Sequence, residues 1–323
     1  MREQIDATGL DLTDMVVLTE AASAAYGVTP VIAAMANARH VYAVTRSTRH
    51  GTVAEVKEWT MALAAAAGVA DRISIAETVD LEAVKQVDLV TNSGHLRPIT
   101  SELIERLPAR AVIALMFEAW EFRPGDVDPV ACQRRQIPIV GVNECHPAVD
   151  VFSYLGPLCV KLLFDAGIPV YQNRIALLCD NSFAEPMLRG LRGAGAKAAL
   201  FGDVDSVPKD EWDAIVVALK PEETPRIDAK SAAHLARVCP PGTLVAQFWG
   251  DMDREALATA GLLTWPLTPP HAGHMAILLS AIGPDPIVRL QTGGLRAAEY
   301  VFRGGSVTND GFAQPVDLTK ITG

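Results

Sequence analysis

The sequence has few cysteines, more acidic than basic residues and no long apolar run, and each shortage excludes a class of protein. Its five cysteines are odd in number and form no CxxC pair, so we predict neither a zinc knuckle nor a disulfide framework. Lys plus Arg number 28 against 38 Asp plus Glu, and the net charge of -10 disfavours nucleic acid and anionic membranes as partners. No apolar run reaches the ~18 residues that a membrane-spanning helix needs.

Charged residues near the start of the sequence, including Arg2, Glu3 and Asp6, argue against a signal peptide there. Aromatic residues are scarce at 6%, yet half of all residues are hydrophobic, which is enough for a large core. A length of 323 residues suggests two domains. We therefore expect a soluble, cytoplasmic two-domain protein that binds a small molecule.

Short apolar segments alternate with helical patterns along the chain. Strands are predicted at 15–18, 40–44, 73–75, 87–90, 111–116, 137–142, 175–178, 198–201, 214–219 and 244–247. Helices are predicted at 21–36, 51–68, 81–86, 100–107, 150–166, 185–194, 228–238, 275–282 and 286–302. This alternation predicts an α/β fold with two Rossmann-like lobes, mostly parallel sheets and an interdomain cleft.

The boundary between the lobes is predicted near residue 150. We place an N-terminal α/β lobe of the substrate-binding type at 1–150 and a second Rossmann-like lobe at 151–285. Residues 286–323 would form a helix that returns to the first lobe, followed by a tail. Ligands of such sheets bind outside the carboxyl ends of the strands, and the cleft between two lobes is the expected site.

Polar residues follow almost every predicted strand, where a structural loop has no need of so many charges. Histidine and glutamate suit acid–base catalysis, so His95 and Glu118 are candidate catalytic residues. Arginine suits anion binding. The candidate substrate-binding residues are Arg46, Asn92, Arg97, Glu121, Glu144, His146 and Trp249.

Several motifs of known chemistry are missing. No HExxH or other short ligand spacing fixes a metal geometry, so we predict no metal site. There is no GxSxG elbow of a serine hydrolase and no Walker A loop.

Four segments occur in the order of a known family: RRQIPIVGVN at 134–143, PGTLV at 241–245, DREAL at 253–257 and LTPPHAG at 267–273. Together with the helix and strand pattern of 99–143, they resemble the D-isomer 2-hydroxyacid dehydrogenases of the formate and glycerate dehydrogenase type. The resemblance implies the two-lobed fold and an oxidoreductase that uses NAD or NADP. It also implies that His271 or His274 is the catalytic acid/base. Related two-lobed enzymes are often dimers, and we expect a homodimer.

The chain departs from that family at three places. The loop at 179–184 reads CDNSFA, without the glycines that let a pyrophosphate approach the backbone. No arginine follows the strand at 244–247, and no acidic residue lies between Gly261 and Thr268. If the second lobe binds a dinucleotide, the candidate residues are Asp180, Asn181, Ser182, Asp203 and Lys220.

The first lobe is the other place for a nucleotide. Small residues fill its first turn, 19–27, and Arg46 and Arg49 stand where an arginine accommodates a 2′-phosphate, although Glu20 argues against this. Three functions therefore stay open: an oxidoreductase acting on a small anionic metabolite, a non-redox lyase, isomerase or transferase on the same scaffold, and a metabolite-binding module.

Overall fold

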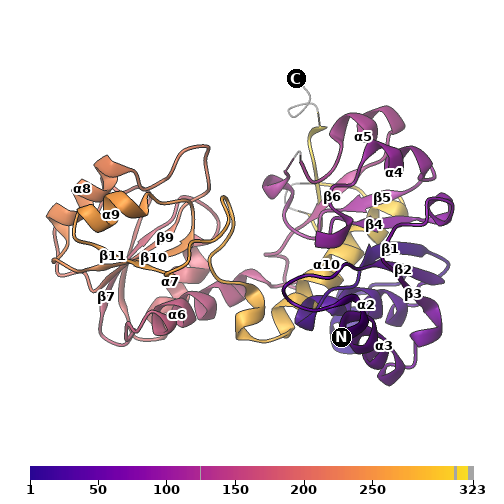
Figure 1. The fold of residues 1–323 in the computed structure, drawn as a ribbon, viewed down its shortest axis with the longest axis horizontal. Helices are drawn as coiled ribbons and strands as arrows, with labels where there is room; N and C mark the ends of the chain where they lie inside the picture. The colour runs from indigo at the N-terminus through magenta and orange to yellow at the C-terminus, as the bar shows by residue number, and fades with distance from the viewer. Residues whose placement is uncertain (124, 309–310, 319–323) are drawn as a thin grey trace. The chain divides into compact units, whose positions relative to one another are not determined.

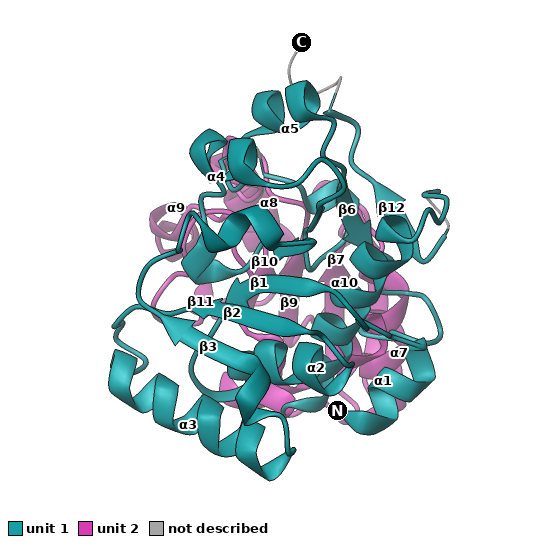
Figure 2. Ribbon diagram, turned by 90° about the vertical axis from the view of Figure 1, so that its right-hand side faces the viewer, with its two compact units in different colours: residues 1–151, 284–323 teal, residues 152–283 magenta. Residues whose placement is uncertain are grey.

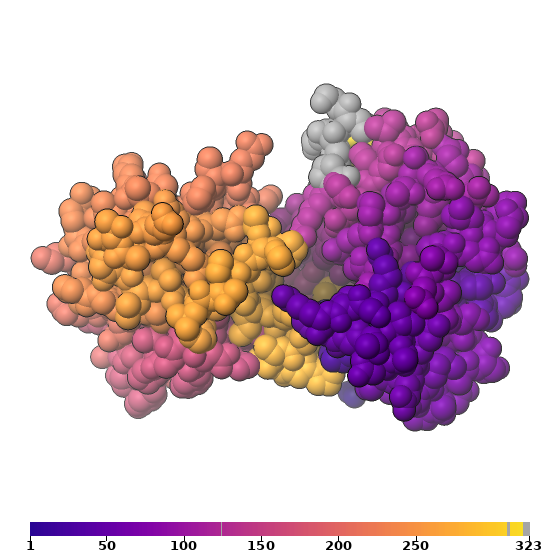
Figure 3. All heavy atoms as spheres, viewed as in Figure 1, coloured from indigo at the N-terminus to yellow at the C-terminus, as the bar shows by residue number. Residues whose placement is uncertain are grey.

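The computed structural model describes residues 1–123, 125–308 and 311–318. It divides into two compact units (Figure 2). Unit 1 combines Met1–Val151 with Pro284–Gly323, and unit 2 is Phe152–Gly283. Both units are built on parallel strands covered by helices, so the predicted α/β fold is confirmed. Figure 3 shows one face of the molecule with all heavy atoms drawn as spheres.

The sheet of unit 1 has seven strands in the order β12-β6-β5-β4-β1-β2-β3. They are β1 (Val16–Glu20), β2 (His40–Val44), β3 (Ile73–Ala76), β4 (Leu89–Thr91), β5 (Val112–Ala114), β6 (Ile139–Val142) and β12 (Ala313–Pro315). Strands β1 to β6 pair in parallel, whereas β12 runs antiparallel to β6. The chain moves outward in one direction from β1 through β2 to β3 and in the other from β4 to β6. The strand order therefore reverses between β1 and β4, and we call such a place a switch point.

Helices cover both faces of this sheet. They are α1 (Arg2–Thr8), α2 (Thr29–Met35), α3 (Val53–Ala66), α4 (Ser101–Arg106), α5 (Pro129–Arg135) and α10 (Asp285–Phe302). Short 3-10 turns are η1 (Ala24–Val28), η2 (Ala70–Arg72), η3 (Ala83–Gln86), η4 (Gly94–Leu96) and η5 (Ala119–Glu121). Because side chains alternate along a strand, Val16 and Leu18 of β1 join the core beneath α4 and α5. Helix α2 contacts β1, β2 and β3.

Helix α10 returns to unit 1, as predicted, and packs on β4, β5, β6 and α2 (Figure 1). Two consecutive glycines make this close packing possible. A Cβ on Gly293 would lie 2.9 Å from Val149 Cγ1, and one on Gly294 would lie 2.6 Å from Met116 Sδ. Any larger residue at either position would push α10 away from the sheet.

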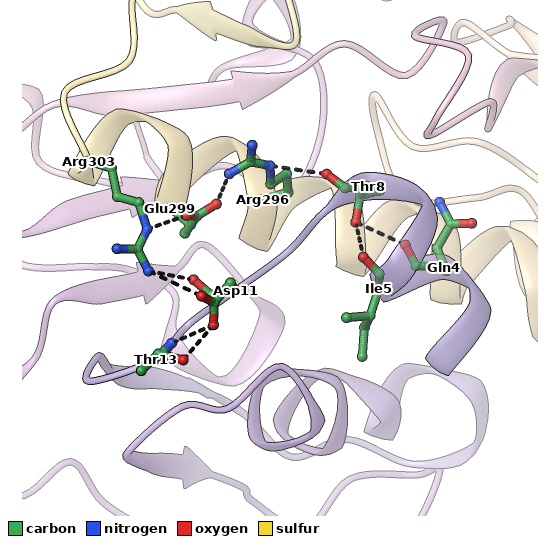
Figure 4. A network of polar contacts seen from close by, with 8 residues as sticks. All are labelled: Gln4, Ile5, Thr8, Asp11, Thr13, Arg296, Glu299 and Arg303. Carbon is green, nitrogen blue, oxygen red and sulfur yellow. Dashed lines mark hydrogen bonds and ion pairs between the residues drawn. The ribbon is translucent and has the colours of Figure 1, made fainter.

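A polar network ties α10 to the first helix of the chain (Figure 4). Glu299 on α10 is 2% exposed and pairs with both Arg296 and Arg303. Arg296 Nε donates to the carbonyl oxygen of Thr8 at 3.1 Å, and Arg303 Nη2 lies 3.9 Å from Asp11 Oδ2. These contacts connect residues that are nearly 300 positions apart in the sequence, and they hold α10 against the N-terminal segment of unit 1.

The sheet of unit 2 has five parallel strands in the order β11-β10-β9-β7-β8. They are β7 (Arg174–Leu178), β8 (Lys197–Phe201), β9 (Ala214–Ala218), β10 (Leu244–Trp249) and β11 (Leu263–Trp265). Its helices are α6 (Leu155–Asp165), α7 (Ala184–Gly193), α8 (Ala229–Val238) and α9 (Arg254–Thr259), with 3-10 turns η6 (Phe152–Tyr154) and η7 (Leu279–Ile282). Its switch point lies between β7 and β9. Leu235 of α8 and Leu257 of α9 pack on one face of this sheet.

Three helix predictions need correction. The helix predicted at 275–282 is wrong, because the Ala276 N–H donates to Phe248 O of β10 and holds the segment as a loop before η7. The helix predicted from 150 begins at Leu155, since Asp150 adopts a left-handed φ of 47°. The helix predicted at 21–36 begins only at Ala24, which has a left-handed φ of 52°, and it consists of the 3-10 turn η1 followed directly by α2.

Candidate functional site

The candidate residues of unit 1 follow β2, β4, β5 and β6 and therefore lie along the carboxyl edge of one sheet. Their contacts separate them into two groups. Arg46, Asn92, His95 and Arg97 surround the switch point. The others are linked to the segment that follows β5, namely Glu118, Glu121 and Glu144, with His146 just beyond.

A pocket of about 360 Å³ opens beside the first group, and we call it the edge pocket. Its walls come from the ends of β2 and β3, the loop after β4 and the start of α4. The lining residues are Val44, Arg46, Glu77, Thr78, Val79, Leu81, His95, Leu96, Arg97, Pro98, Thr100, Glu102 and Leu103. Ligand pockets typically measure ~300–1,000 Å³ and combine apolar walls with a few polar groups. The edge pocket has both properties.

Two side chains hold the loop after β4 in place at this pocket. Glu20, the last residue of β1, accepts the N–H of His95 at its Oε2, at 2.9 Å. Arg46 Nη2, from the loop after β2, donates to the His95 carbonyl oxygen. Among the described residues, Arg46 Nε and Nη1 have no partner, and neither has the imidazole of His95. A cation and a titratable ring thus remain available to a ligand.

Contacts with Asn92, Asp126 and Phe117 fix the orientation of the Arg97 side chain. Its Nε donates to Asn92 Oδ1 at 3.0 Å and lies 3.4 Å from Asp126 Oδ2, while its guanidinium lies 5.7 Å from the centre of the Phe117 ring. Burial lowers the pKa of Arg97, which Asp126 opposes. Within the described part of the chain, Nη1 of Arg97 has no partner, so this group can bind an anion without losing its supports.

A second, apolar hollow of about 80 Å³ lies next to the edge pocket. The two share Val44, Thr78 and Val79 as wall residues. The hollow extends inward along β1, β2 and β3 to Leu18 and Val84. An apolar group bound in the edge pocket therefore has adjoining space of the same character.

The Glu118 carboxylate has a structural role, because its hydrogen bonds link neighbouring segments of unit 1. Its carboxylate accepts the Glu144 N–H at 2.8 Å, Trp120 Nε1 at 2.9 Å and Gln314 Nε2 at 3.1 Å. Gln314 belongs to β12 and accepts the Ala119 N–H through its own Oε1. Three donors satisfy this buried carboxylate, which links the segment after β5 to β6 and β12.

Glu144 is a buried acid of a different kind. It is 6% exposed, and burial together with the nearby Glu121 and Glu118 raises the pKa of its carboxyl well above the usual range. His146 lies apart from the edge pocket: its ring packs against Phe312 at 4.8 Å, and its Nδ1 accepts the Ala148 N–H. The structure thus does not place these residues among those that line the edge pocket.

The switch point of unit 2 is filled by a side chain. Asp180, after β7, accepts the Lys220 N–H from the loop after β9 at 2.8 Å and pairs with Arg226 Nη1 at 2.9 Å. Burial would raise the pKa of Asp180, but hydrogen bonds from Lys220, Asn181 and Arg226 outweigh it and lower this pKa. Asn181 also donates from Nδ2 to Ala218 O at 2.8 Å. A carboxylate and its cation therefore occupy the place where a phosphate binds in folds of this kind.

Aromatic side chains pack against the loop that follows β7. The Phe183 ring, one residue before α7, stacks on Trp249 with 5.2 Å between ring centres. Trp249 is buried in unit 2, and its Nε1 donates to Gly273 O at 3.0 Å. Ser182 precedes Phe183 in the same turn. A nicotinamide dinucleotide in unit 2 does not fit this arrangement, because the loop lacks glycine and its anion site holds Asp180.

The remaining candidates of unit 2 lie on its loops. Asp203, after β8, accepts the Ser206 N–H at 2.8 Å. His271 and His274 are exposed, with 6.0 Å between ring centres. Asp251, which the sequence reasoning missed, accepts the Gly273 N–H at 3.0 Å and so anchors the histidine loop.

No group of three or more His, Cys, Asp or Glu side chains is placed to hold a metal ion in residues 1–123, 125–308 and 311–318. Over the same residues, no helix is both long enough and apolar enough to cross a membrane. The five cysteines are free thiols, as expected, and Cys145 alone of them is exposed.

No protein-family model and no curated protein matches the sequence. The solved structures do show likenesses in fold. The A chain of dipicolinate synthase from Bacillus subtilis superposes with a TM-score of 0.59 at 11% identity, over 92% of this chain and 99% of that one. NAD⁺-bound 3-phosphoglycerate dehydrogenase from Entamoeba histolytica gives 0.56 at 11% identity, over 94% and 99%.

NAD-dependent formate dehydrogenase from Staphylococcus aureus, in complex with NAD, gives a TM-score of 0.52 at 12% identity, over 91% of this chain and 97% of that one. All three likenesses extend over nearly the whole of both chains. The chain therefore has the fold of these proteins, which confirms the fold implied by the resemblance to D-isomer 2-hydroxyacid dehydrogenases.

Proposed function

We propose that the chain binds a small anionic metabolite in the edge pocket of unit 1 and carries out non-redox acid–base chemistry on it. The observation that carries this proposal is Asp180 at the switch point of unit 2. Its carboxylate, held by Lys220 N–H and Arg226, fills the site that a cofactor phosphate would need. The edge pocket, which is open and lined by charged residues, lies in unit 1.

Each residue of the edge pocket has a role in this proposal. Arg46 and Arg97 bind the anionic group of the ligand through their unpaired N–H groups. His95, whose backbone is held by Glu20 and Arg46, transfers a proton to or from the ligand. Asn92 and Asp126 position Arg97 and need not touch the ligand. A lyase or isomerase reaction that moves a proton beside an anionic group suits this set.

Three measurements test the proposal. NADH, followed by nicotinamide fluorescence, is expected to show no saturable binding up to ~1 mM, well above the usual micromolar range. A panel of small carboxylates and phosphates is expected to include compounds that raise the melting temperature of the wild-type chain, and Arg46→Ala should remove that effect. Turnover of a compound found this way should fall at least a hundredfold in His95→Ala. His50→Ala is the matched control, because His50 is an exposed histidine of the same unit outside the pocket.

The second candidate function is an NAD(P)-dependent oxidoreductase. The fold shared with two NAD-bound dehydrogenases favours it, as does the pair His271 and His274. Saturable NADH binding that survives Arg46→Ala, with reduction of 2-keto acids that is lost in His271→Ala or His274→Ala, would establish this function and end the first proposal.

We further propose a homodimer in the cytoplasm. Light scattering of the purified chain at micromolar concentration tests the dimer, and a single-chain mass would contradict it.

A further inference from the structure

Unit 1, and not unit 2, has the strand order of dinucleotide-binding sheets. Its six parallel strands run 3-2-1-4-5-6, from β3 to β6, whereas the order in unit 2 is 2-1-3-4-5. In both orders, nucleotides bind at the carboxyl edge around the point where the order reverses. In unit 2 that place holds Asp180, paired with Arg226. In unit 1 the edge pocket lies at that edge, between the ends of β2 and β3 and the loop after β4.

The side chain that follows β2 decides which nucleotide such a sheet accepts. An acidic residue there binds a ribose hydroxyl, and an arginine accommodates a phosphate on the ribose. Arg46 stands two residues after β2, lines the edge pocket and keeps two N–H groups without a partner among the described residues. Its place favours a phosphorylated ribose as the anionic group.

We infer that the edge pocket binds a nucleoside monophosphate, with its phosphate on Arg46 and its base against the apolar walls. The inference rests on the proposed function, since it names the ligand class of the same pocket. Val79, Leu81 and Leu103 supply an aliphatic slot for the base, and the adjoining hollow of about 80 Å³ extends it. The carboxylates of Glu77 and Glu102, on two walls of the pocket, can accept the ribose hydroxyls.

The same contacts exclude a full dinucleotide. A pyrophosphate needs the turn after β1, but Glu20 places a carboxylate there on the His95 N–H. A Cβ on Gly94 would lie 3.1 Å from Glu20 Oε2, so this corner is already filled. About 360 Å³ is also near the lower end of the range of ligand pockets, which suits one nucleoside rather than two.

The test is calorimetric titration of the full chain with adenosine 5′-monophosphate, adenosine 2′-monophosphate, adenosine, ribose 5-phosphate and inorganic phosphate. One of the two monophosphates is expected to bind at least tenfold more tightly than adenosine, ribose 5-phosphate or inorganic phosphate. Arg46→Ala should weaken that binding at least tenfold. Arg39→Ala, at an exposed arginine just before β2 that does not line the edge pocket, should leave it unchanged.

A second variant separates this inference from the proposed function. Leu81→Trp fills the slot for the base, so it should abolish nucleotide binding while inorganic phosphate still binds at Arg46. Melting curves confirm that each variant is folded. If both monophosphates bind no more tightly than inorganic phosphate, and small anions still bind through Arg46, the inference fails and the proposed function stands. If no anion binds at all, both fail.

Discussion

At the switch point of each unit a carboxylate accepts a backbone N–H, but the surroundings of the two carboxylates differ. In unit 1 the carboxylate of Glu20 accepts the N–H of His95, and in unit 2 that of Asp180 accepts the N–H of Lys220. Each bond joins the end of the first strand of its sheet to the loop after the neighbouring strand. Asp180 also pairs with Arg226, and Phe183 stacks on Trp249 beside it. Glu20 instead adjoins the edge pocket.

This comparison shows that a fold shared with NAD-bound enzymes does not settle where a ligand binds. In unit 2 the protein supplies both the anion and the cation of the site, so an incoming phosphate would have to displace a paired carboxylate. In unit 1 the carboxylate only fixes a loop, and the cations Arg46 and Arg97 keep open donors. The predictions below test the contrast, beginning with the largest effect.

Glu299→Ala should destabilise unit 1 and leave unit 2 nearly unchanged. The variant leaves Arg296 and Arg303 without their buried partner and loosens the link between α10 and α1. We expect a loss of about 3 kcal/mol, because breaking a buried ion pair typically costs ~3–5 kcal/mol and both arginines are partly exposed. Hydrogen exchange resolved by peptide is the measurement: protection should fall in β5 and β6 and persist in β9 and β10. Equal loss in both units would contradict the division.

Asp180→Ala should open the switch point of unit 2 to anions. The variant removes the carboxylate that accepts the Lys220 N–H and pairs with Arg226, at an expected cost of about 2 kcal/mol in urea unfolding. Arg226 keeps Glu222 and the Lys220 carbonyl oxygen as partners, so it stays in place to bind an anion. Sulfate at millimolar concentration should restore part of that stability. Because the pKa of Asp180 is lowered by folding, the stability it contributes is present above the ordinary aspartate pKa and is lost as the pH falls below it. The variant should therefore lose less stability than the wild type on acidification.

Asp205→Ala is the matched control for this experiment. Asp205 is an exposed carboxylate of the same unit, 3.4 Å from Lys230, and its removal should change stability by less than about 0.5 kcal/mol. Sulfate stabilises many proteins by exclusion from their surface, and the control measures that general effect. If sulfate stabilises both variants equally, Asp180 does not occupy an anion site.

Glu144→Gln should stabilise unit 1 at neutral pH. Folding raises the pKa of Glu144, so the folded chain holds a proton that the unfolded chain releases, and stability falls as the pH rises from the ordinary glutamate pKa toward the raised one. Glutamine resembles the protonated acid and carries no charge beside Glu118 and Glu121. We expect a gain of about 1 kcal/mol at pH 8 and none at pH 4, measured by urea unfolding. The same gain at both pH values would show that the charge of Glu144 is not the cause.

The sequence predicts the order and type of most strands because their apolar segments are short and bounded by turn residues. It fails where a distant contact overrides local preference: the segment 275–278 has a helical pattern, yet Ala276 is bonded to β10. The loop residues of both lobes could be named from strand ends alone. Their partners could not, because Arg226 is 46 residues from Asp180 and Gln314 is 196 from Glu118, and no local spacing indicates either pair.

Glu20→Gln is the most sensitive test of the difference between the switch points. The amide oxygen can still accept the His95 N–H, so stability should change by less than about 0.5 kcal/mol. The negative charge that acts on Arg97 disappears, and we expect the loss of this partly exposed charge to be worth about 0.6 kcal/mol. Anion affinity of the edge pocket should therefore rise about threefold in calorimetric titration. Asp180→Asn makes the same change in unit 2 and should leave that affinity unaltered. An unchanged affinity in Glu20→Gln would mean that Glu20 and Asp180 both have a purely structural role. The two switch points would then not differ in their electrostatic effect on a bound anion.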